Sequence, residues 1–197
     1  AGTETRHTTY SFFLNPRYTS YSLIRWLQSC PPHNNRGGWF DPYLCDKPLN
    51  SYAEQAYMTL FAKPEEITLF CYGSLKDTRY IPLLGYELLR MDKFLGALGQ
   101  PVGVKTYIPY HSDGEGNLYD FLGMCGVPCD PVAVFPGEPC TVLLTASSAC
   151  DPDVLARARE HLTAGNDVAF TAGFVRLMQD RGLEEFREEQ TAPVGEP

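Results

Sequence analysis

The feature that most constrains the fold is a strand–helix–strand pattern within residues 136–182. Two apolar runs, at 142–144 and 168–170, each stop at small or polar residues. Between these runs, apolar residues recur at helical spacing over 154–162. Two short apolar strands joined by an amphipathic helix are typical of a parallel crossover unit, in which helices cover the faces of a buried sheet.

The ends of this helix carry boundary residues. Asp151 or Asp153 can accept a hydrogen bond from the free amides at the helix start, and Pro152 is tolerated in the first turn. Gly165 can adopt the left-handed conformation that closes a helix. The boundary residues and the apolar pattern therefore predict the same element.

The same alternation of strands and helices extends over most of the chain. Continuous apolar runs near 67–72, 102–108, 141–145 and 167–171 predict strands that are buried and parallel within their own sheets. Weaker patterns predict strands at 8–14, 37–43 and 129–135 and helices at 18–28, 51–62 and 117–125. A long helix is expected at 81–98, with an apolar stripe that consists of Leu84, Leu88, Met91, Leu95 and Leu98.

A break at Gln100 and Pro101 divides this series into two segments of an α/β protein with parallel-sheet strand–helix repeats. Residues 1–99 hold three strand–helix pairs, too few for a barrel of eight. They form either a partial barrel-like segment or part of a common open sheet. Residues 100–183 resemble a flavodoxin-like open sheet, and the acidic tail 184–197 is expected to be disordered.

Charge and hydropathy exclude two classes of partner. The net charge is −8, and basic residues form no cluster longer than a pair, so nucleic-acid binding is not expected. No apolar stretch approaches the ~20 residues that span a bilayer, so no membrane partner is expected.

The chain has seven cysteines, an odd number, so at least one is unpaired within the chain. Cys125 and Cys129 are separated by three residues, which is not the C-x-x-C spacing of redox or zinc sites. Packing cysteines, a disulfide and a metal site stay open as alternatives, with reduced packing cysteines favoured. We predict no metal site and no cofactor.

The segments EITLFCYGSL (66–75), the long helix that follows it, PVGVKTYIPY (101–110) and VLLTASSACDPDVLARAREHLTAGNDVAFTAGF (142–174) carry a family resemblance. Their order resembles the end of a barrel-type glycoside hydrolase of the β-galactosidase kind. In that family the barrel precedes an open-sheet domain that is similar to class I glutamine amidotransferases and serves oligomerisation. The resemblance implies carbohydrate binding or hydrolysis in a longer parent, with a homo-oligomer or an additional protein segment as partner. The alternative is a non-catalytic oligomerisation or ligand-binding α/β domain.

The resemblance also implies where the catalytic groups lie. Such barrels use two glutamates, and the place that matches the second glutamate offers Asp41 in this chain. A retaining glycosidase needs two carboxyl groups ~5–5.5 Å apart. The acid of the fourth barrel strand has no counterpart in this sequence, so we expect no glycosidase turnover from the chain alone.

Aromatic residues near Asp41 are candidates for ligand binding. Trp39, Tyr43 and Tyr72 lie at predicted strand ends, where their rings can stack on sugars. The alternative is that these residues belong to the core and its turns. His111 follows another strand and can act with Asp113 as an acid–base pair, or the segment 110–116 is simply a flexible turn.

The sequence argues against amidotransferase chemistry. That chemistry needs a nucleophilic cysteine in a G-x-C-x-G turn and a downstream histidine. Cys150 follows a strand but has no adjacent glycine, and the neighbouring Asp151 would raise the pKa of its thiol. His161 lies within the next helix, where we expect it to be exposed.

Overall fold

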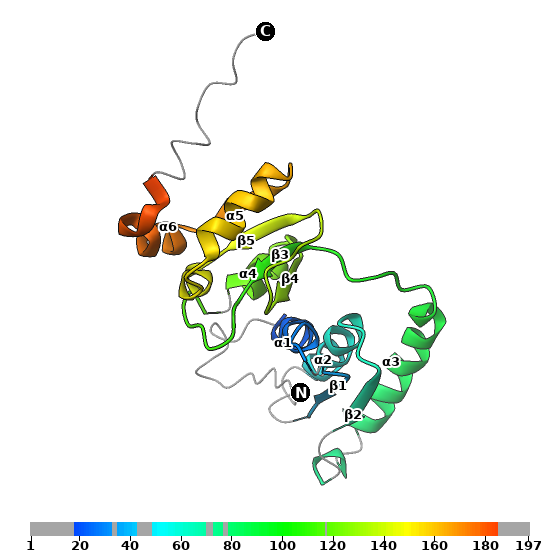
Figure 1. Cartoon of the computed structure of the whole chain (residues 1–197). Helices are drawn as coiled ribbons and strands as arrows, with labels where there is room; N and C mark the ends of the chain where they lie inside the picture. Colours follow the sequence, from blue (N-terminus) through cyan, green and yellow to red (C-terminus); the bar gives the residue numbers. More distant parts are fainter. Residues whose placement is uncertain are drawn as a thin grey trace. The chain divides into compact units, whose positions relative to one another are not determined.

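The computed structural model describes residues 18–32, 35–42, 49–69, 73–76, 79–116 and 118–184 (Figure 1). The chain divides into two compact units. The first consists of residues 1–103 and 117–131, and the second of residues 104–116 and 132–197. Parallel strands alternate with helices, so the predicted α/β class is correct and is consistent with a partial barrel and an open sheet.

The first unit contains a two-stranded parallel sheet. Strand β1 (Gly37–Phe40) pairs with β2 (Glu66–Leu69), so that Gly38 lies opposite Ile67 and Phe40 opposite Leu69. The predicted strands at 37–43 and 67–72 are therefore present and parallel over their described parts. The helical segments of this unit are α1 (Thr19–Gln28), α2 (Asn50–Phe61), η1 (Ser74–Lys76), α3 (Tyr80–Leu95) and α4 (Leu118–Met124). The predicted strand at 8–14 lies outside the described residues.

Helices α1 and α2 pack closely on β1 at a glycine. A Cβ atom at Gly38 would lie 2.8 Å from Ile24 Cδ1 and 2.9 Å from Thr59 Cγ2. These distances are shorter than ordinary van der Waals contact, so the close approach of both helices requires the absence of a side chain at this position.

The core of the first unit is built around three aromatic rings. Phe40, Tyr52 and Tyr80 form a chain of tilted and edge-on contacts, with centroid distances of 5.3 and 5.2 Å. Such pairs contribute beyond the area they bury, because ring edges and faces carry opposite partial charges. Ala56, Leu60, Leu84 and Met91 complete this core.

The buried stripe of α3 differs from the predicted one. Leu84 and Met91 are buried as expected, but Leu88 and Leu95 are 40% and 38% exposed. Leu98 lies beyond the end of the helix. The prediction was therefore correct for Leu84 and Met91 and wrong for the other three residues of the stripe.

A polar residue explains the difference. Glu87 occupies the buried face of α3 between Leu84 and Met91. The Tyr57 hydroxyl donates to its carboxylate at 2.7 Å, and Arg90 forms an ion pair with it at 3.2 Å. Because the carboxylate has these partners, the helix can bury it and turn other apolar residues outward.

The predicted burial of β2 was also wrong. Glu66, Thr68 and Leu69 are exposed, and only Ile67 packs against the core. The reason is that β2 pairs with β1 alone within the described part of the chain, so that one edge of the strand is open.

The second unit contains three parallel neighbouring strands. Strand β3 (Val104–Tyr107) pairs with β5 (Thr141–Leu144), which pairs in turn with β6 (Asp167–Phe170). Beside β3, the Ile108 N–H donates to the carbonyl oxygen of Val132, the last residue of β4 (Cys129–Val132), at 2.9 Å. The helical segments are η2 (Ala146–Cys150), α5 (Val154–Thr163), α6 (Ala172–Met178) and η3 (Gln179–Leu183).

The crossover between β5 and β6 follows the prediction closely. Helix α5 connects the two strands, and Gly165 after its end has the left-handed φ of +84°. Asp151 Oδ1 accepts a hydrogen bond at 2.9 Å, but the donor is the N–H of Asp153 just before the helix. The Asp151 side chain therefore stabilises the turn before α5, and Gly165 ends the helix.

The central strand β5 supplies the best-buried residues of the second core. Val142 and Leu144 are fully buried against Val154, Ala158 and Phe174. Strand β6 lies at the edge of the sheet and alternates between exposed and half-buried residues, so its predicted burial was wrong. No helix in the described ranges is both long and apolar enough to cross a bilayer.

Candidate functional site

Strand β1 has two faces, and the predicted site residues lie on the face away from the helices. Gly38 and Phe40 are buried toward α1 and α2. Side chains alternate along a strand, so Trp39 points to the opposite face, and Asp41 continues that alternation just after the strand. Thr68 of β2 lies opposite Trp39. In a (β/α) barrel this face lines the interior, and catalytic groups gather at the carboxyl ends of its strands.

The position of Asp41 is set by α2. Gln55 Nε2 donates to the Asp41 carbonyl oxygen at 2.9 Å, and both residues are buried. Asp41 is only 1% exposed, whereas Trp39 is half-buried. The structure therefore places the indole nearer to solvent than the carboxylate.

Tyr43 and Tyr72, the other two predicted platforms, lie outside the described residues. The same holds for Cys71. Of the predicted cluster, the described residues are Trp39, within β1, and Asp41, directly after it.

The nearest sheet carboxylate on this face does not form a catalytic pair with Asp41. Glu66 lies opposite Gly37, four residues before Asp41 along the sheet. Four residues of a strand span about 13 Å. Glycosidase carboxyl pairs are separated by ~5–5.5 Å in retaining enzymes and ~6.5–9.5 Å in inverting ones, so Glu66 does not supply the second carboxyl group.

His111 lies in the second unit, on the loop after β3. Its backbone has a φ of +56°, and the side chain is exposed, as is that of Asp113. Both residues therefore face solvent, which is the arrangement of a surface turn.

The group that this loop brings to the carboxyl edge of the sheet is Glu115, which the sequence analysis missed. Its Oε2 accepts from the Ala146 N–H at 2.7 Å and from Thr171 Oγ1 at 2.6 Å. Its Oε1 accepts from the Gly173 N–H at 3.0 Å. The available signal was the glycine on either side of Glu115, which permits an unusual backbone path.

The second unit also brings a cysteine and a histidine together, but not the expected pair. Cys150 is exposed, whereas His161 is buried and its Nε2 lies 4.0 Å from Cys140 Sγ. The expectation of an exposed His161 was therefore wrong, because its ring packs edge-on against Phe135 at 5.7 Å.

This thiol–imidazole contact is not arranged for nucleophilic catalysis. His161 Nε2 lies 2.9 Å from the Cys140 carbonyl oxygen, which can only accept, so Nε2 carries a proton and donates it there. Burial, with Glu138 nearby, raises the pKa of the Cys140 thiol. A protonated thiol beside a histidine nitrogen that is already a donor is a poor nucleophile. Cys125, Cys140 and Cys150 are free thiols.

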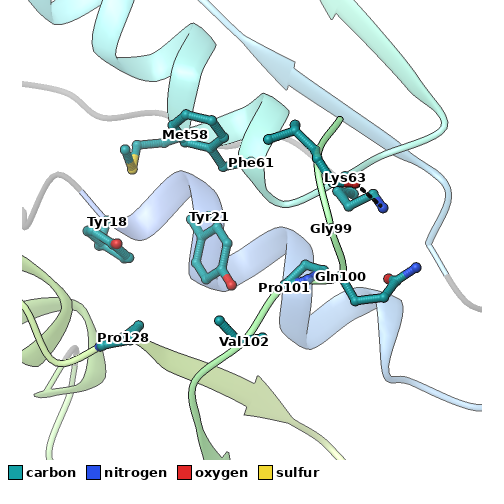
Figure 2. A pocket seen from close by; sticks show the side chains of 11 residues that line it. Tyr18, Tyr21, Met58, Phe61, Lys63, Gly99, Gln100, Pro101, Val102 and Pro128 are labelled. Carbon is teal, nitrogen blue, oxygen red and sulfur yellow. Dashed lines mark hydrogen bonds between the residues drawn. The ribbon is translucent and has the colours of Figure 1, made fainter. Parts of the chain in front are cut away.

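The first unit contains a separate pocket of about 270 Å³ on the surface of α1 and α2 (Figure 2). Tyr18 and Tyr21 meet edge-on at 5.5 Å along α1, and Lys63 Nζ donates to the Leu98 carbonyl oxygen at 3.5 Å. Burial, then the charge of Asp130, raises the pKa of Tyr21 to about 12. The pocket lining is completed by Met58, Phe61, Gly99, Gln100, Pro101, Val102 and Pro128. This lining has no carboxylate and includes neither Trp39 nor Asp41.

Comparison with protein families gives two matches. Residues 1–82 match a family described as "Probable glycosyl hydrolase, catalytic domain". Residues 99–188 match a family described as "Uncharacterized protein SSO3021, second domain". No curated protein and no solved structure matches the chain. The N-terminal part of the chain, which includes β1, Trp39 and Asp41, is thus similar to a glycosyl hydrolase catalytic domain.

Proposed function

We propose that the first unit forms part of a carbohydrate site in a glycoside hydrolase of the β-galactosidase kind. The site is the face of β1 and β2 that is turned away from the helices. One observation supports this most directly. Trp39 lies near the carboxyl end of a parallel strand and Asp41 follows directly after that strand, within the segment that is similar to a glycosyl hydrolase catalytic domain.

In this proposal Trp39 is the sugar platform and the buried Asp41 is the candidate catalytic carboxylate of the site. The face of an indole ring stacks on the C–H bonds of a pyranose, and a half-buried ring exposes part of such a face. Asp41 needs a second carboxyl group to cleave a glycosidic bond, and Glu66 is too far along the sheet to supply it. The chain alone therefore binds oligosaccharides weakly and does not hydrolyse them.

A fluorescence titration tests the binding. The chain has two tryptophans, Trp26 and Trp39, so Trp26→Phe leaves Trp39 as the only indole reporter. We expect a saturable fluorescence change with oligosaccharides in Trp26→Phe and none in Trp39→Phe. Calorimetric titration of Trp39→Ala should show at least a tenfold loss of affinity, about 1.4 kcal/mol.

The same preparations test the catalytic part. We expect no release of aryl alcohol from aryl glycosides by the parent chain, with Asp41→Asn as the matched control. Hydrolysis that disappears in Asp41→Asn would contradict the non-catalytic claim. The absence of any saturable response to a panel of oligosaccharides would contradict the carbohydrate site itself.

A further inference from the structure

The pocket on the surface of α1 and α2 has mostly apolar walls (Figure 2). Tyr18 and Tyr21 line it from the start of α1, and Met58 and Phe61 line it from the end of α2. The segment 98–102 forms another side, and all of these residues belong to the first unit. Aromatic rings and a thioether present polarizable surfaces, which pack well against an aromatic ligand.

One buried polar group faces this space. Tyr21 is only 8% exposed, and Figure 2 shows its hydroxyl directed toward Pro101 and Val102 of the lining. No described residue forms a hydrogen bond with this hydroxyl, although charged groups lie nearby. Burial raises the pKa of Tyr21 to about 12, so the hydroxyl keeps its proton at neutral pH and can donate. A buried donor without a partner costs free energy, and a ligand oxygen at this place removes that cost.

A cation lines the same pocket. The backbone of Lys63 is held on both sides, because its N–H donates to the Leu60 carbonyl oxygen at 2.9 Å and its carbonyl oxygen accepts from Gln28 Nε2 at 3.2 Å. The Lys63 ammonium donates to the Leu98 carbonyl oxygen at 3.5 Å, which is a long contact. An ammonium has three protons, so two remain for a ligand. Within the described part of the chain, no carboxylate pairs with Lys63.

The charges around the pocket favour an anionic ligand. Asp130 is the anion whose charge acts on Tyr21. Arg25 binds Asp130 through Nε at 2.7 Å and Nη2 at 3.1 Å, so the charges of this pair offset each other. The lining itself contains the Lys63 ammonium and no carboxylate. A ligand with a negative charge therefore complements the pocket.

The size of the pocket and the positions of its two polar groups narrow the ligand further. The volume is about 270 Å³, whereas a cavity of ~150 Å³ accepts benzene and drug-sized ligands occupy ~300–1,000 Å³. A single aromatic ring with small substituents therefore fits. Figure 2 shows the Tyr21 hydroxyl and the Lys63 ammonium well apart, which places two polar contacts at different ends of the ligand.

We propose that this pocket binds a monocyclic aromatic carboxylate with a second oxygen at the opposite end of its ring. The ring packs against Met58 and Phe61, the carboxylate accepts from the Lys63 ammonium, and the second oxygen accepts from the Tyr21 hydroxyl. The lining includes neither Trp39 nor Asp41, so this inference does not rest on the proposed carbohydrate site.

Three related probes test the two polar contacts by calorimetric titration of the full chain. Para-hydroxybenzoate has both polar groups, benzoate lacks the hydroxyl group, and phenol lacks the carboxylate. We expect saturable binding of para-hydroxybenzoate. Benzoate should bind roughly threefold more weakly and phenol roughly tenfold more weakly, because a hydrogen bond between charged groups contributes more than a neutral one.

Two variants assign these contacts to their residues. Tyr21→Phe removes the hydroxyl and keeps the ring, so it should weaken para-hydroxybenzoate to the level of benzoate and leave benzoate unchanged. Lys63→Gln removes the charge, so it should weaken both acids roughly tenfold and leave phenol unchanged. The matched controls are Tyr86→Phe and Lys93→Gln, which change exposed residues of α3 and should alter none of the three affinities.

The methionine methyl groups locate the ligand in the parent chain, so this measurement holds even if a variant does not fold. Of the four methionines, Met58 lines the pocket and Met91, Met124 and Met178 do not. The ring current of a bound aromatic acid shifts a methyl resonance that it contacts. Para-hydroxybenzoate should shift the Met58 methyl resonance with the affinity found by calorimetry and leave the other three unchanged. Met58→Leu identifies the resonance.

Four results would overturn the proposal. One is the absence of saturable binding for all three probes. Another is binding without a shift of the Met58 resonance, which would place the ligand elsewhere. Equal affinities for phenol and para-hydroxybenzoate would show that the pocket does not select a carboxylate. The last is an unchanged affinity for para-hydroxybenzoate in both Tyr21→Phe and Lys63→Gln.

Discussion

Asp120 in α4 is a carboxyl group that the fold keeps away from water. It is 1% exposed, and burial raises its pKa to about 6, although the nearby hydroxyls of Ser22 and Thr19 act in the opposite direction. The Thr19 hydroxyl donates to Asp120 Oδ2 at 3.4 Å, a long contact that offsets little of the desolvation. Asp120 therefore binds its proton more tightly in the folded than in the unfolded chain.

This residue makes stability depend on pH in a defined direction. Between the ordinary pKa of 3.8 and the raised value of about 6, the folded state holds more protons, so stability falls as pH rises through that window. We expect Asp120→Asn to raise the free energy of unfolding at pH 7 by roughly 1–3 kcal/mol and to change it little below pH 4. Urea unfolding from pH 4 to pH 8 measures this, with the exposed Asp92→Asn as control. A parent chain that becomes more stable through this window, with no difference in Asp120→Asn, would contradict the assignment.

At the scale of residues, periodicity predicted one part of the candidate site and could not predict another. Trp39 lies on the face of β1 opposite to Gly38 and Phe40 because strand side chains alternate, which the sequence shows directly. The choice between His111 and Glu115 depends on positive φ angles in a loop and on donors from two distant turns. No local pattern specifies those donors, so the sequence alone could not indicate the contacts of Glu115, and the role of His111 stays a prediction.

At the scale of elements, α3 offers a matched pair of leucines. Leu84 is 4% exposed and lies in the first core, whereas Leu89 is 70% exposed on the same helix. We expect Leu84→Ala to cost roughly 2–5 kcal/mol because it leaves a cavity, and Leu89→Ala to stay within about 0.5 kcal/mol. Denaturant unfolding measures the free energy of unfolding of both variants. Both change a leucine to alanine in one helix, so the change in helix propensity is the same and the difference reports burial. Similar losses in both variants would show that the outward face of α3 is also packed.

The same helix shows why element positions were predictable and element faces were less so. Apolar residues lie on more than one side of α3, since Ile81 and Leu89 are exposed while Leu84 and Met91 are buried. On such a helix the spacing of apolar residues is compatible with two different apolar stripes, so it does not decide which face is buried. The polar contact that decides between them, Tyr57 with Glu87, joins residues that are 30 positions apart.

At the scale of the whole molecule, the two units have separate hydrophobic cores. Leu144 is fully buried in the second core, so Leu144→Ala should cost roughly 2–5 kcal/mol there. Hydrogen exchange with mass spectrometry should show lost protection in β3, β5 and α5 and little change in α2 and α3. Leu84→Ala should give the reciprocal pattern. Equal loss of protection in both units would mean that they unfold as one cooperative system.

The ion pair between Arg25 and Asp130 has a consequence for the order of events during synthesis. Arg25 Nε lies 2.7 Å from Asp130 Oδ1 and Nη2 lies 3.1 Å from Oδ2, yet the two residues are 105 positions apart. At ~5–20 residues per second, a ribosome takes roughly 5–20 s to cover that distance. Strand β3, which belongs to the second unit, is translated in between. Arg25 is therefore synthesised several seconds before the carboxylate that neutralises it, so the first unit cannot complete this ion pair until the start of the second unit has been made.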